Sequence, residues 1–374
     1  LILLMLALAL PIFLLYILLI GNYTYHWLKI PVFKNRLAGQ QRAFTVVIAA
    51  RNESDNIGSL LLALQGQQYP TELIEIIVVD DRSTDQTAEI VRKFPQVRLI
   101  QDKNESEAGG KKRSLELGIH QAKNEWMLTT DADCLPGPKW IATINAYLDQ
   151  ENPVCLVGPV SVSSIHGSIL QEFQRYDNLM FQGITGAAIS AQQHTLGKGA
   201  NLCYRKDCFE AVGGFNGIDQ LASGDDVLLI EKFMSTFPGQ VQFLKCNSAL
   251  VNTHAAETWQ ALWQQRIRWV SKAHAYQGWR LQGAQWITGL FNLILLAQTI
   301  YCIVHPADWK TTTSIWMFKA LIEWPLIRSV ASLYQERRSF IIYLLLQPLH
   351  VIYLVSIGIF GQRRQYKWKG RSVH

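Results

Sequence analysis

Short apolar runs alternate with amphipathic segments between residues 43 and 130. The apolar runs are rich in β-branched residues and have the length of strands. They lie at residues 44–50, 74–79, 97–100 and 126–130. The segments between them place apolar residues three and four positions apart, as amphipathic helices do, and lie at residues 56–67, 84–93 and 111–123. Strands that alternate with helices predict an α/β fold with a mainly parallel sheet covered on both faces.

Much longer apolar segments lie near the two ends of the chain. Residues 1–20 carry no charged side chain and match the ~20 residues that cross a bilayer core. A cleaved signal peptide has a shorter apolar stretch, so we expect this segment to remain as an anchor. Three further apolar segments follow near the other end, at residues 286–304, 313–333 and 340–360. The middle one is the weakest, because Lys319, Glu323 and Arg328 interrupt it, and the last contains Pro348.

Basic residues beside these segments predict the orientation of the chain. Lys29, Lys34, Arg36 and Arg42 follow the first apolar segment, so the positive-inside rule places the next domain in the cytoplasm. The end of the chain is also basic, with Arg363, Arg364, Lys367, Lys369 and Arg371. If all three late segments crossed the membrane, this tail would lie outside, against the same rule. We therefore expect one of them to be re-entrant or interfacial, with the tail cytoplasmic.

These patterns divide the chain into six parts. They are an N-terminal transmembrane helix (1–20), a basic juxtamembrane linker (21–42), an α/β domain (43–255), an interfacial helix region (256–283), transmembrane or re-entrant segments (284–361) and a basic tail (362–374). We expect an integral protein of a bacterial inner (plasma) membrane.

The composition agrees with a membrane protein. Of the 374 residues, 49% are hydrophobic and only 17% are charged, where about 25% is usual for soluble proteins. A basic tail beside an apolar segment favours contact with anionic membrane lipids over nucleic acid, for which no binding motif is present. The six cysteines form no CxxC pair, which argues against a zinc site and for reduced thiols.

Acidic residues follow three of the predicted strands. Glu53 comes after the first strand, Asp80 and Asp81 end the second, and Asp131 and Asp133 follow the fourth. Because ligands of parallel sheets bind beyond the carboxyl ends of the strands, these acids are expected to converge at one edge. Residues two positions apart on an extended segment face the same way, so Asp131 and Asp133 can bind one cation together. A hard cation, Mg²⁺ or Mn²⁺, suits these oxygen ligands and usually binds substrate phosphates as well.

Six motifs occur in the order seen in membrane-bound family 2 glycosyltransferases. They read AARNESDNI, VVDDRSTDQT, GGKKRSLELG, TTDADC, SGDDVLL and QQRIRW. The chain therefore resembles the GT-A enzymes of that family, which are related to cellulose, hyaluronan and poly-N-acetylglucosamine synthases and to lipid glycosyltransferases. The resemblance covers about residues 43–270. It implies a GT-A, Rossmann-like cytoplasmic domain flanked by transmembrane helices.

The resemblance implies a nucleotide-sugar site on the first four motifs. The matching residues are Glu53, Asp80, Asp81, Lys111, Asp131 and Asp133. The first three match nucleotide contacts, the lysine matches a phosphate contact and is preferred over Lys112, and the last two match the metal and diphosphate site. Structural alternatives stay open: an Asx-turn at Asp80 and Asp81, a helix cap formed by residues 83–85, and a solvated basic turn at Lys111.

The last two motifs imply an acceptor side. Asp226, in the Asp225–Asp226 pair, matches the catalytic base that takes the proton of the acceptor hydroxyl, although Glu is common at the first position. The alternative is that Asp226 caps the helix from Val227. The QxxRW residues share one helix face and match contacts to the acceptor and the diphosphate; they are Gln265, Arg268 and Trp269. The alternative for this triplet is an interfacial anchor.

Three weaker features complete the pattern. His254 is a candidate further metal ligand, with a structural histidine as the alternative. Residues 197–201 (GKGAN) resemble an acceptor-side loop without the FFCGS-like form of cellulose-type synthases, which argues against processive polymerisation. Residues 368–371 (WKGR) resemble a tail motif of non-processive relatives and are predicted either to return to the diphosphate or to bind lipid.

Together these features predict an inverting, metal-dependent glycosyltransferase. We expect it to move a sugar from a nucleotide donor, with UDP preferred, to a lipid or lipid-linked glycan at the cytoplasmic face of the membrane. One alternative is a processive polysaccharide synthase, and a nucleotidyltransferase shares the nucleotide-binding sheet. An alternative of another class is a non-catalytic scaffold or transporter with a degenerate nucleotide-binding domain.

Overall fold

A mixed seven-stranded sheet forms the centre of the domain, in the order β3-β2-β1-β4-β8-β6-β9. Its strands are β1 (Phe44–Ala50), β2 (Ile74–Asp80), β3 (Val97–Gln101), β4 (Trp126–Thr129), β6 (Cys155–Val157), β8 (Leu202–Arg205) and β9 (Val241–Phe243). A second sheet contains β5 (Cys134–Pro136), β10 (Val251–His254) and β7 (Val160–Ser163). The computed structural model describes residues 2–34, 39–102, 110–163, 167–218, 225–271, 278–361, 366–368 and 371–373.

Strands β1, β2, β3 and β4 run parallel, and three of them lead to the predicted acids. In β1, Ala50 lies opposite Asp80 of β2, and Val47 lies opposite Thr129 of β4. The carboxyl ends of these strands therefore meet at one edge of the sheet. Only β8 runs antiparallel to β4, so the predicted mainly parallel α/β sheet is confirmed.

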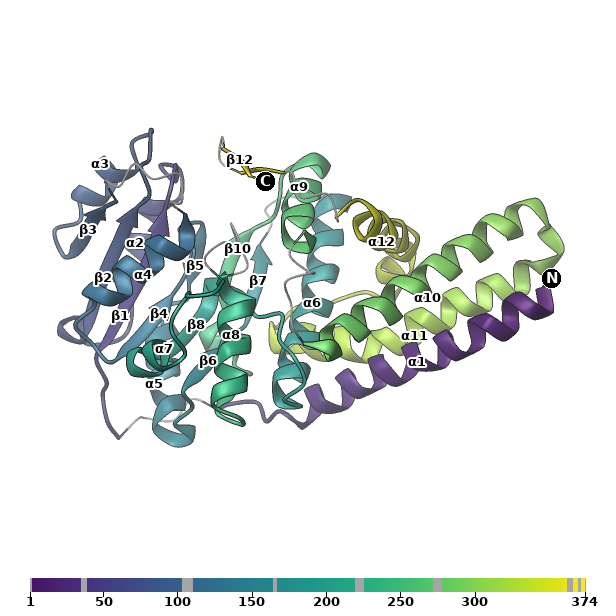
Figure 1. The fold of residues 1–374 in the computed structure, drawn as a ribbon, viewed down its shortest axis with the longest axis horizontal. Helices are drawn as coiled ribbons and strands as arrows, with labels where there is room; N and C mark the ends of the chain where they lie inside the picture. The colour runs from purple at the N-terminus through teal and green to yellow at the C-terminus, as the bar shows by residue number, and fades with distance from the viewer. Residues whose placement is uncertain are drawn as a thin grey trace.

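Helices cover both faces of this sheet (Figure 1). The helices of the domain are α2 (Ile57–Gln65), α3 (Thr87–Arg92), α4 (Lys111–Gln121), α5 (Trp140–Glu151), α6 (Ile169–Ser190), α7 (Lys206–Ala211), α8 (Asp225–Thr236) and α9 (Trp259–Val270). Gly118 lets α4 approach β1, because a Cβ at this position would lie 2.5 Å from Val47 Cγ1. Such close packing fixes the start of α4, and with it Lys111, beside the acidic edge.

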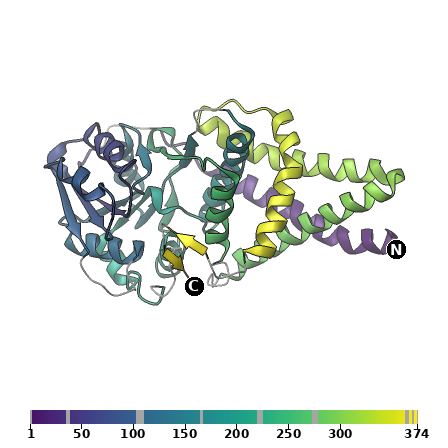
Figure 2. The same cartoon turned by 90° about the horizontal axis from the view of Figure 1, so that it is seen from above.

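Four long helices extend from the domain. They are α1 (Ile2–Lys29), α10 (Trp279–Val304), α11 (Trp309–Leu333) and α12 (Phe340–Phe360). The first extends beyond the predicted residue 20 to Lys29. Figures 1 and 2 show α1, α10 and α11 running side by side away from the sheet, whereas α12 runs across them next to the domain. Among the described residues, α1, α10 and α12 are long and apolar enough to cross a membrane, and α11 is not.

Helix α6 joins the domain to these long helices. Its Gly183 and Gly186 allow close approach, because a Cβ there would lie 2.8 Å from Leu326 and 2.7 Å from Trp27. Trp27 is fully buried near the end of α1. Its carbonyl oxygen accepts a hydrogen bond of 2.8 Å from Lys245 Nζ, a favourable place for a cation because a helix is electronegative at its C-terminus. The domain therefore holds the end of α1 by both packing and charge.

The two charges that weaken α11 as a membrane span are paired with each other. Lys319 and Glu323 are 0% and 1% exposed, and Lys319 Nζ donates to both carboxylate oxygens of Glu323, at 2.7 and 2.9 Å. Tyr16 of α1 and Tyr343 of α12 also donate to this carboxylate, as does Gln347 at 2.9 Å. A buried ion pair is tolerated when its remaining hydrogen-bonding positions are satisfied, as they are here. The network joins α1, α11 and α12.

Removing one partner of this pair is expected to destabilise the protein. Lys319→Met leaves the Glu323 carboxylate buried without its cation, which typically costs about 3–5 kcal/mol of unfolding free energy. The double variant Lys319→Met/Glu323→Gln restores charge balance and should recover most of the loss. Thermal unfolding in detergent checks both, with Lys310→Met at the exposed start of α11 as the control. Equal unfolding temperatures for all variants would show that the pair is not a structural link.

Candidate active site

The second strand ends in two buried acids that are already partnered. Asp80 and Asp81 are 3% and 2% exposed. Asp80 Oδ1 accepts a hydrogen bond of 3.2 Å from the Ser83 backbone N–H, three residues on, which is one residue beyond the partner in the expected Asx-turn. Asp81 lies beside Arg51, at 3.8 Å, and Arg82, at 3.3 Å. These arginines balance its charge, while the nucleotide role of both acids stays a prediction.

Two loops at this edge are fastened to each other. Asn52 and Arg82 adopt positive φ angles, +50° and +55°, which non-glycine residues adopt only when their surroundings hold them there. The Asn52 N–H donates to Ser83 Oγ at 3.0 Å, and Asn52 Oδ1 accepts from the Thr84 N–H at 2.8 Å. These bonds place Glu53 toward the end of β4.

The predicted helix cap at residues 83–85 is wrong in part. Only Asp85 bonds to the start of α3, where its Oδ1 accepts from the Thr87 N–H at 3.0 Å. Ser83 and Thr84 bond across to the neighbouring loop instead. The pattern DDRSTD looks like a local cap, because sequence spacing does not reveal a partner from another loop.

Asp131, Asp133 and Cys134 form a compact cluster after β4. One potential ligand atom from each lies within 4.8 Å of the others. Burial raises the pKa of Asp133, and the carboxylates of Asp131 and Glu53 raise it further. Gathered acids that disfavour their own charge are what a divalent cation stabilises, so the site fits Mg²⁺ or Mn²⁺ held by the two carboxylates. The buried Cys134 thiol instead donates to Asp133, at 3.6 Å.

Lys111 provides the positive charge on this cluster. Its Nζ lies 2.5 Å from Asp131 Oδ1, and it stands on the first turn of α4, where backbone N–H groups also favour anions. Lys112 is buried and donates to the Ile218 carbonyl, so the expected choice of Lys111 over Lys112 agrees with this geometry. Gly109 lies outside the described residues.

His254 does not join the cluster. It is exposed at the end of β10, and its ring nitrogens are not among the grouped ligand atoms of the described residues. Thr253, one residue earlier, pairs with Cys134 across the small sheet, so the backbone passes close while the imidazole does not reach the carboxylates. The geometry gives no support to a ligand role.

Asp226 sits at the start of α8 and is held by backbone N–H groups. Its Oδ2 accepts from Gly199 at 2.9 Å, and its Oδ1 accepts from Val227 at 2.9 Å. The second bond is the expected helix-end contact, and the first ties the carboxylate to the GKGAN loop. Asp225 begins the helix, but its side chain and Gly224 lie outside the described residues.

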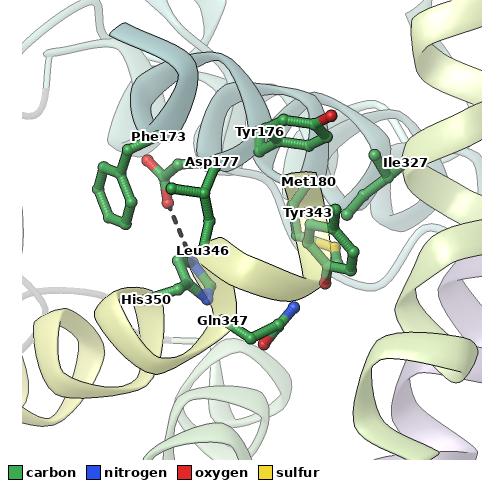
Figure 3. A pocket seen from close by; sticks show the side chains of 9 residues that line it. All are labelled: Phe173, Tyr176, Asp177, Met180, Ile327, Tyr343, Leu346, Gln347 and His350. Atoms are coloured by element: carbon green, nitrogen blue, oxygen red, sulfur yellow. Dashed lines mark ion pairs between the residues drawn. The ribbon is translucent and has the colours of Figure 1, made fainter. Parts of the chain in front are cut away.

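The QxxRW residues lie half-buried on α9. Arg266, for which no role was predicted, makes the strongest contacts there. Arg266 pairs with Asp177 of α6 at 2.6 Å, and its Cζ lies 4.2 Å from the centre of the Trp269 ring. Asp177 also lies 3.4 Å from His350 of α12, as Figure 3 shows. Arg266 stands inside the motif at a variable position, and a lone Asp177 on a long helix carries no signal. The acceptor role of Gln265, Arg268 and Trp269 stays a prediction.

The tail returns to the domain. Strands β11 (Tyr366–Trp368) and β12 (Arg371–Val373) form a hairpin, and β11 contacts α9. Lys369 and Gly370 of the WKGR stretch lie outside the described residues. The backbone therefore ends beside the helix that carries QxxRW.

A family comparison decides the class. Residues 45–213 match the family described as "Glycosyl transferase family 2". The chain contains a family 2 glycosyltransferase domain. The recognised motifs up to TTDADC lie inside this match, whereas Asp226 and QxxRW follow it.

Individual proteins support this assignment. Probable glycosyltransferase YdaM of Bacillus subtilis (strain 168) is 26% identical over 60% of this chain and 54% of that protein. Poly-beta-1,6-N-acetyl-D-glucosamine synthase of Staphylococcus epidermidis is 25% identical over 71% of this chain and 64% of that protein. The chain thus spans between about half and two thirds of the length of these relatives.

A solved structure confirms the fold. The glycosyltransferase domain and its helices resemble the mannosyltransferase PcManGT from Pyrobaculum calidifontis, solved in complex with GDP-Man and Mn²⁺. The TM-score is 0.58 at 19% identity, over 89% of this chain and 98% of that chain. At this identity the likeness concerns the fold alone, and the predicted GT-A-type α/β architecture is confirmed.

The stability of the protein is expected to depend on the protonation of Glu231. This half-buried residue of α8 follows Asp226 by five positions, and burial raises its pKa from 4.5 to about 7. Between these values the folded chain holds a proton that the unfolded chain releases, so stability falls as pH rises through this window. Glu231→Gln should therefore show a smaller drop in unfolding temperature between pH 5 and pH 7.5. The same drop in Glu231→Gln as in the exposed control Glu210→Gln would contradict this assignment.

Proposed function

We propose that this glycosyltransferase moves a sugar from a nucleotide donor, UDP-linked in the first instance, to a lipid or lipid-linked glycan acceptor. The observation that carries the proposal is the carboxylate pair Asp131 and Asp133, bonded to Lys111 at the edge where parallel strands end. That arrangement suits a diphosphate, because a lysine, a helix N-terminus and a divalent cation all act on negative charge. Asp80, Asp81 and Glu53 complete the nucleotide side.

The reaction proposed for these residues is a single displacement. The Asp226 carboxylate accepts the proton of an acceptor hydroxyl, the freed oxygen bonds to the anomeric carbon, and the bond to the donor phosphate breaks. The two backbone N–H bonds of Asp226 hold its carboxylate beside the GKGAN loop. Attack opposite the leaving group turns an α-linked donor into a β-linked product. When bound at Asp131 and Asp133, a Mg²⁺ or Mn²⁺ ion supplies positive charge to the departing diphosphate.

The packing between the long helices favours a single transfer over processive synthesis. The similar poly-N-acetylglucosamine synthase makes processive synthesis the alternative activity. A polymer synthase needs a passage through the membrane for its growing chain. Between α1, α11 and α12, however, the Lys319–Glu323 pair is buried and fully bonded. Side chains that are packed and paired in this way leave that space filled, which supports one transfer to a membrane-bound acceptor.

The direction of α12 suggests how the chain meets the membrane. If α1, α10 and α11 cross the bilayer, α12 lies in the membrane plane on the side of the domain (Figure 2). Its exposed apolar side chains recur at helical spacing and include Ile341, Leu345, Ile352 and Ile359. A helix that lies in the interface turns such a face to lipid. This arrangement places the tail on the catalytic side, in the predicted cytoplasm.

Cysteine labelling tests this topology. In a Cys302→Ser background, Asp308→Cys, between α10 and α11, should react with a membrane-impermeant maleimide applied to intact cells. Ser372→Cys in the tail and Lys93→Cys on the exposed side of α3 should react only after permeabilisation, because both lie on the other side. Labelling of Ser372→Cys in intact cells together with Asp308→Cys would mean that α12 crosses the membrane.

A donor screen tests the activity. Detergent-purified protein is incubated with a panel of UDP- and GDP-sugars and Mn²⁺ or Mg²⁺, and release of the nucleoside diphosphate is measured. One donor should be turned over. Removal of the proton acceptor in Asp226→Asn is expected to lower the rate about 10²–10⁴-fold, and Asp133→Ala or EDTA should abolish metal-dependent release.

Glu210→Gln, an exposed acid-to-amide change on α7, is the matched control and should keep full activity. Absence of release from every donor, together with no binding of UDP or GDP in the presence of metal, would reject the glycosyltransferase reading and favour a non-catalytic scaffold.

A further inference from the structure

Lys198, in the GKGAN loop, lies where α6 and α9 meet. Its Nζ donates a 2.7 Å hydrogen bond to Asn178 Oδ1 of α6. The same ammonium lies 5.1 Å from the centre of the Phe181 ring and 5.4 Å from that of Trp269. An amide oxygen and two aromatic rings therefore hold this cation, and one of the rings belongs to the QxxRW motif.

In the described part of the chain no carboxylate oxygen lies within ion-pair distance of Lys198 Nζ, although the charges of Asp177 and Asp226 act on it from further away. Arg266, the neighbouring cation, pairs with Asp177 at 2.6 Å, whereas the ion pairs of the described residues do not include Lys198. A hydrogen bond from a neutral amide fixes the direction of an ammonium but does not neutralise it. An anion from outside the described structure would complete this site.

Burial makes this charge costly. Burial and, to a smaller extent, the nearby Arg266 guanidinium lower the pKa of Lys198 to about 8, although the Asp177 and Asp226 carboxylates act in the opposite direction. Desolvating a cation without a counter-ion is unfavourable, and the cost is recovered when an anion binds. Sites that bind charged substrates retain such groups because the gain appears only with the ligand.

Two neighbours place Lys198 between the two halves of the proposed reaction. The next residue, Gly199, donates its N–H to the proposed base Asp226. On the other side, the Gly199 carbonyl oxygen accepts a 3.0 Å hydrogen bond from Thr129 Oγ1 at the end of β4, two residues before Asp131. The loop that carries Lys198 thus lies between the strand that leads to the proposed diphosphate site and the base proposed for the acceptor.

The surroundings of Lys198 are anchored to the membrane side of the protein. Asp177, next to Asn178 on α6, contacts both Arg266 of α9 and His350 of α12. In Figure 3 the Asp177 side chain points to His350 across a cavity lined by α6, α11 and α12. These contacts hold the Trp269 ring and the Asn178 amide in place around the ammonium.

We propose that Lys198 binds a phosphate group at the transfer centre. This assignment rests on the proposed function and adds a residue to it. Phosphate is the anion that both substrates of such a reaction can supply, either as the diphosphate of the donor or as the phosphate of a lipid-linked acceptor. The position of Lys198 between both halves of the site suits either source.

The test compares Lys198→Met and Lys198→Arg with the parent protein and with Lys93→Met, an exposed control on α3. The first arm measures binding of UDP and GDP with Mn²⁺ by calorimetry. The second measures sugar transfer to vesicles that contain either a polyprenyl phosphate or diacylglycerol. Lys198→Met is expected to lose about ten- to a hundredfold in one arm, the size of one charge-assisted hydrogen bond, and Lys198→Arg should retain part of it.

The results of the two arms distinguish the donor phosphate from the acceptor phosphate. Weaker nucleotide binding by Lys198→Met supports the donor diphosphate as the ligand. Unchanged nucleotide binding with a loss of transfer to polyprenyl phosphate alone supports the acceptor phosphate. Unchanged behaviour in both arms, or unchanged nucleotide binding with an equal loss of transfer to both acceptors, overturns the assignment to Lys198 while the proposed function stands. Absence of nucleotide binding and of transfer in the parent protein overturns both.

Discussion

Carboxylates from neighbouring parallel strands meet at one edge of the sheet, and their mutual repulsion is the constraint around which this domain is arranged. Asp81 is balanced by Arg51 and Arg82, and Asp131 by Lys111. Asp133 keeps a raised pKa, because burial and its acidic neighbours outweigh the effect of the lysine. Positive charge is thus supplied to Asp81 and Asp131, while the charged form of Asp133 remains disfavoured. In the proposed function, a cation and a diphosphate would together relieve this repulsion.

Helix α6 connects this chemistry to the membrane. In its first half, Asp177 and Asn178 hold Arg266 and Lys198, and through them the Trp269 ring. Two turns further along, Gly183 and Gly186 let α11 and α1 pack against the same helix. Because one rigid helix carries both sets of contacts, the acceptor side of the site has a fixed position relative to the long helices. An acceptor that resides in the bilayer would need such a fixed position.

The long helices solve a related electrostatic problem in a different way. Lys319 and Glu323 cannot be hydrated where they lie, so each must be neutralised by the other, with hydrogen bonds from α1 and α12 completing the pair. At the sheet edge, Asp133 keeps a raised pKa beside Asp131 and Glu53, whereas this pair is fully satisfied. The difference separates charges that serve structure from charges that are available for chemistry.

The sequence by itself determined the order of strands and helices, the parallel sheet and the gathering of Asp80, Asp131 and Asp133 at one edge. These features follow from local periodicity and from the rule that parallel strands end on the same side. It also predicted that one late apolar segment differs from the others, but not which one. Periodicity records which residues are apolar and is silent on the direction in which a helix packs.

Only the tertiary structure decided which partners the polar residues take. Ser83 and Thr84 bond to the Asn52 loop instead of their own helix, and Lys319 and Glu323, which weaken α11 as a membrane span, are paired with each other. Neither Lys198 nor Arg266 was assigned a role of its own from the sequence, because a lysine in a glycine-rich loop or an arginine on a helix is usually solvated. Their surroundings come from helices α6 and α9, which are distant in sequence. Burial and pairing across such distances depend on packing, and packing is a property of the folded chain.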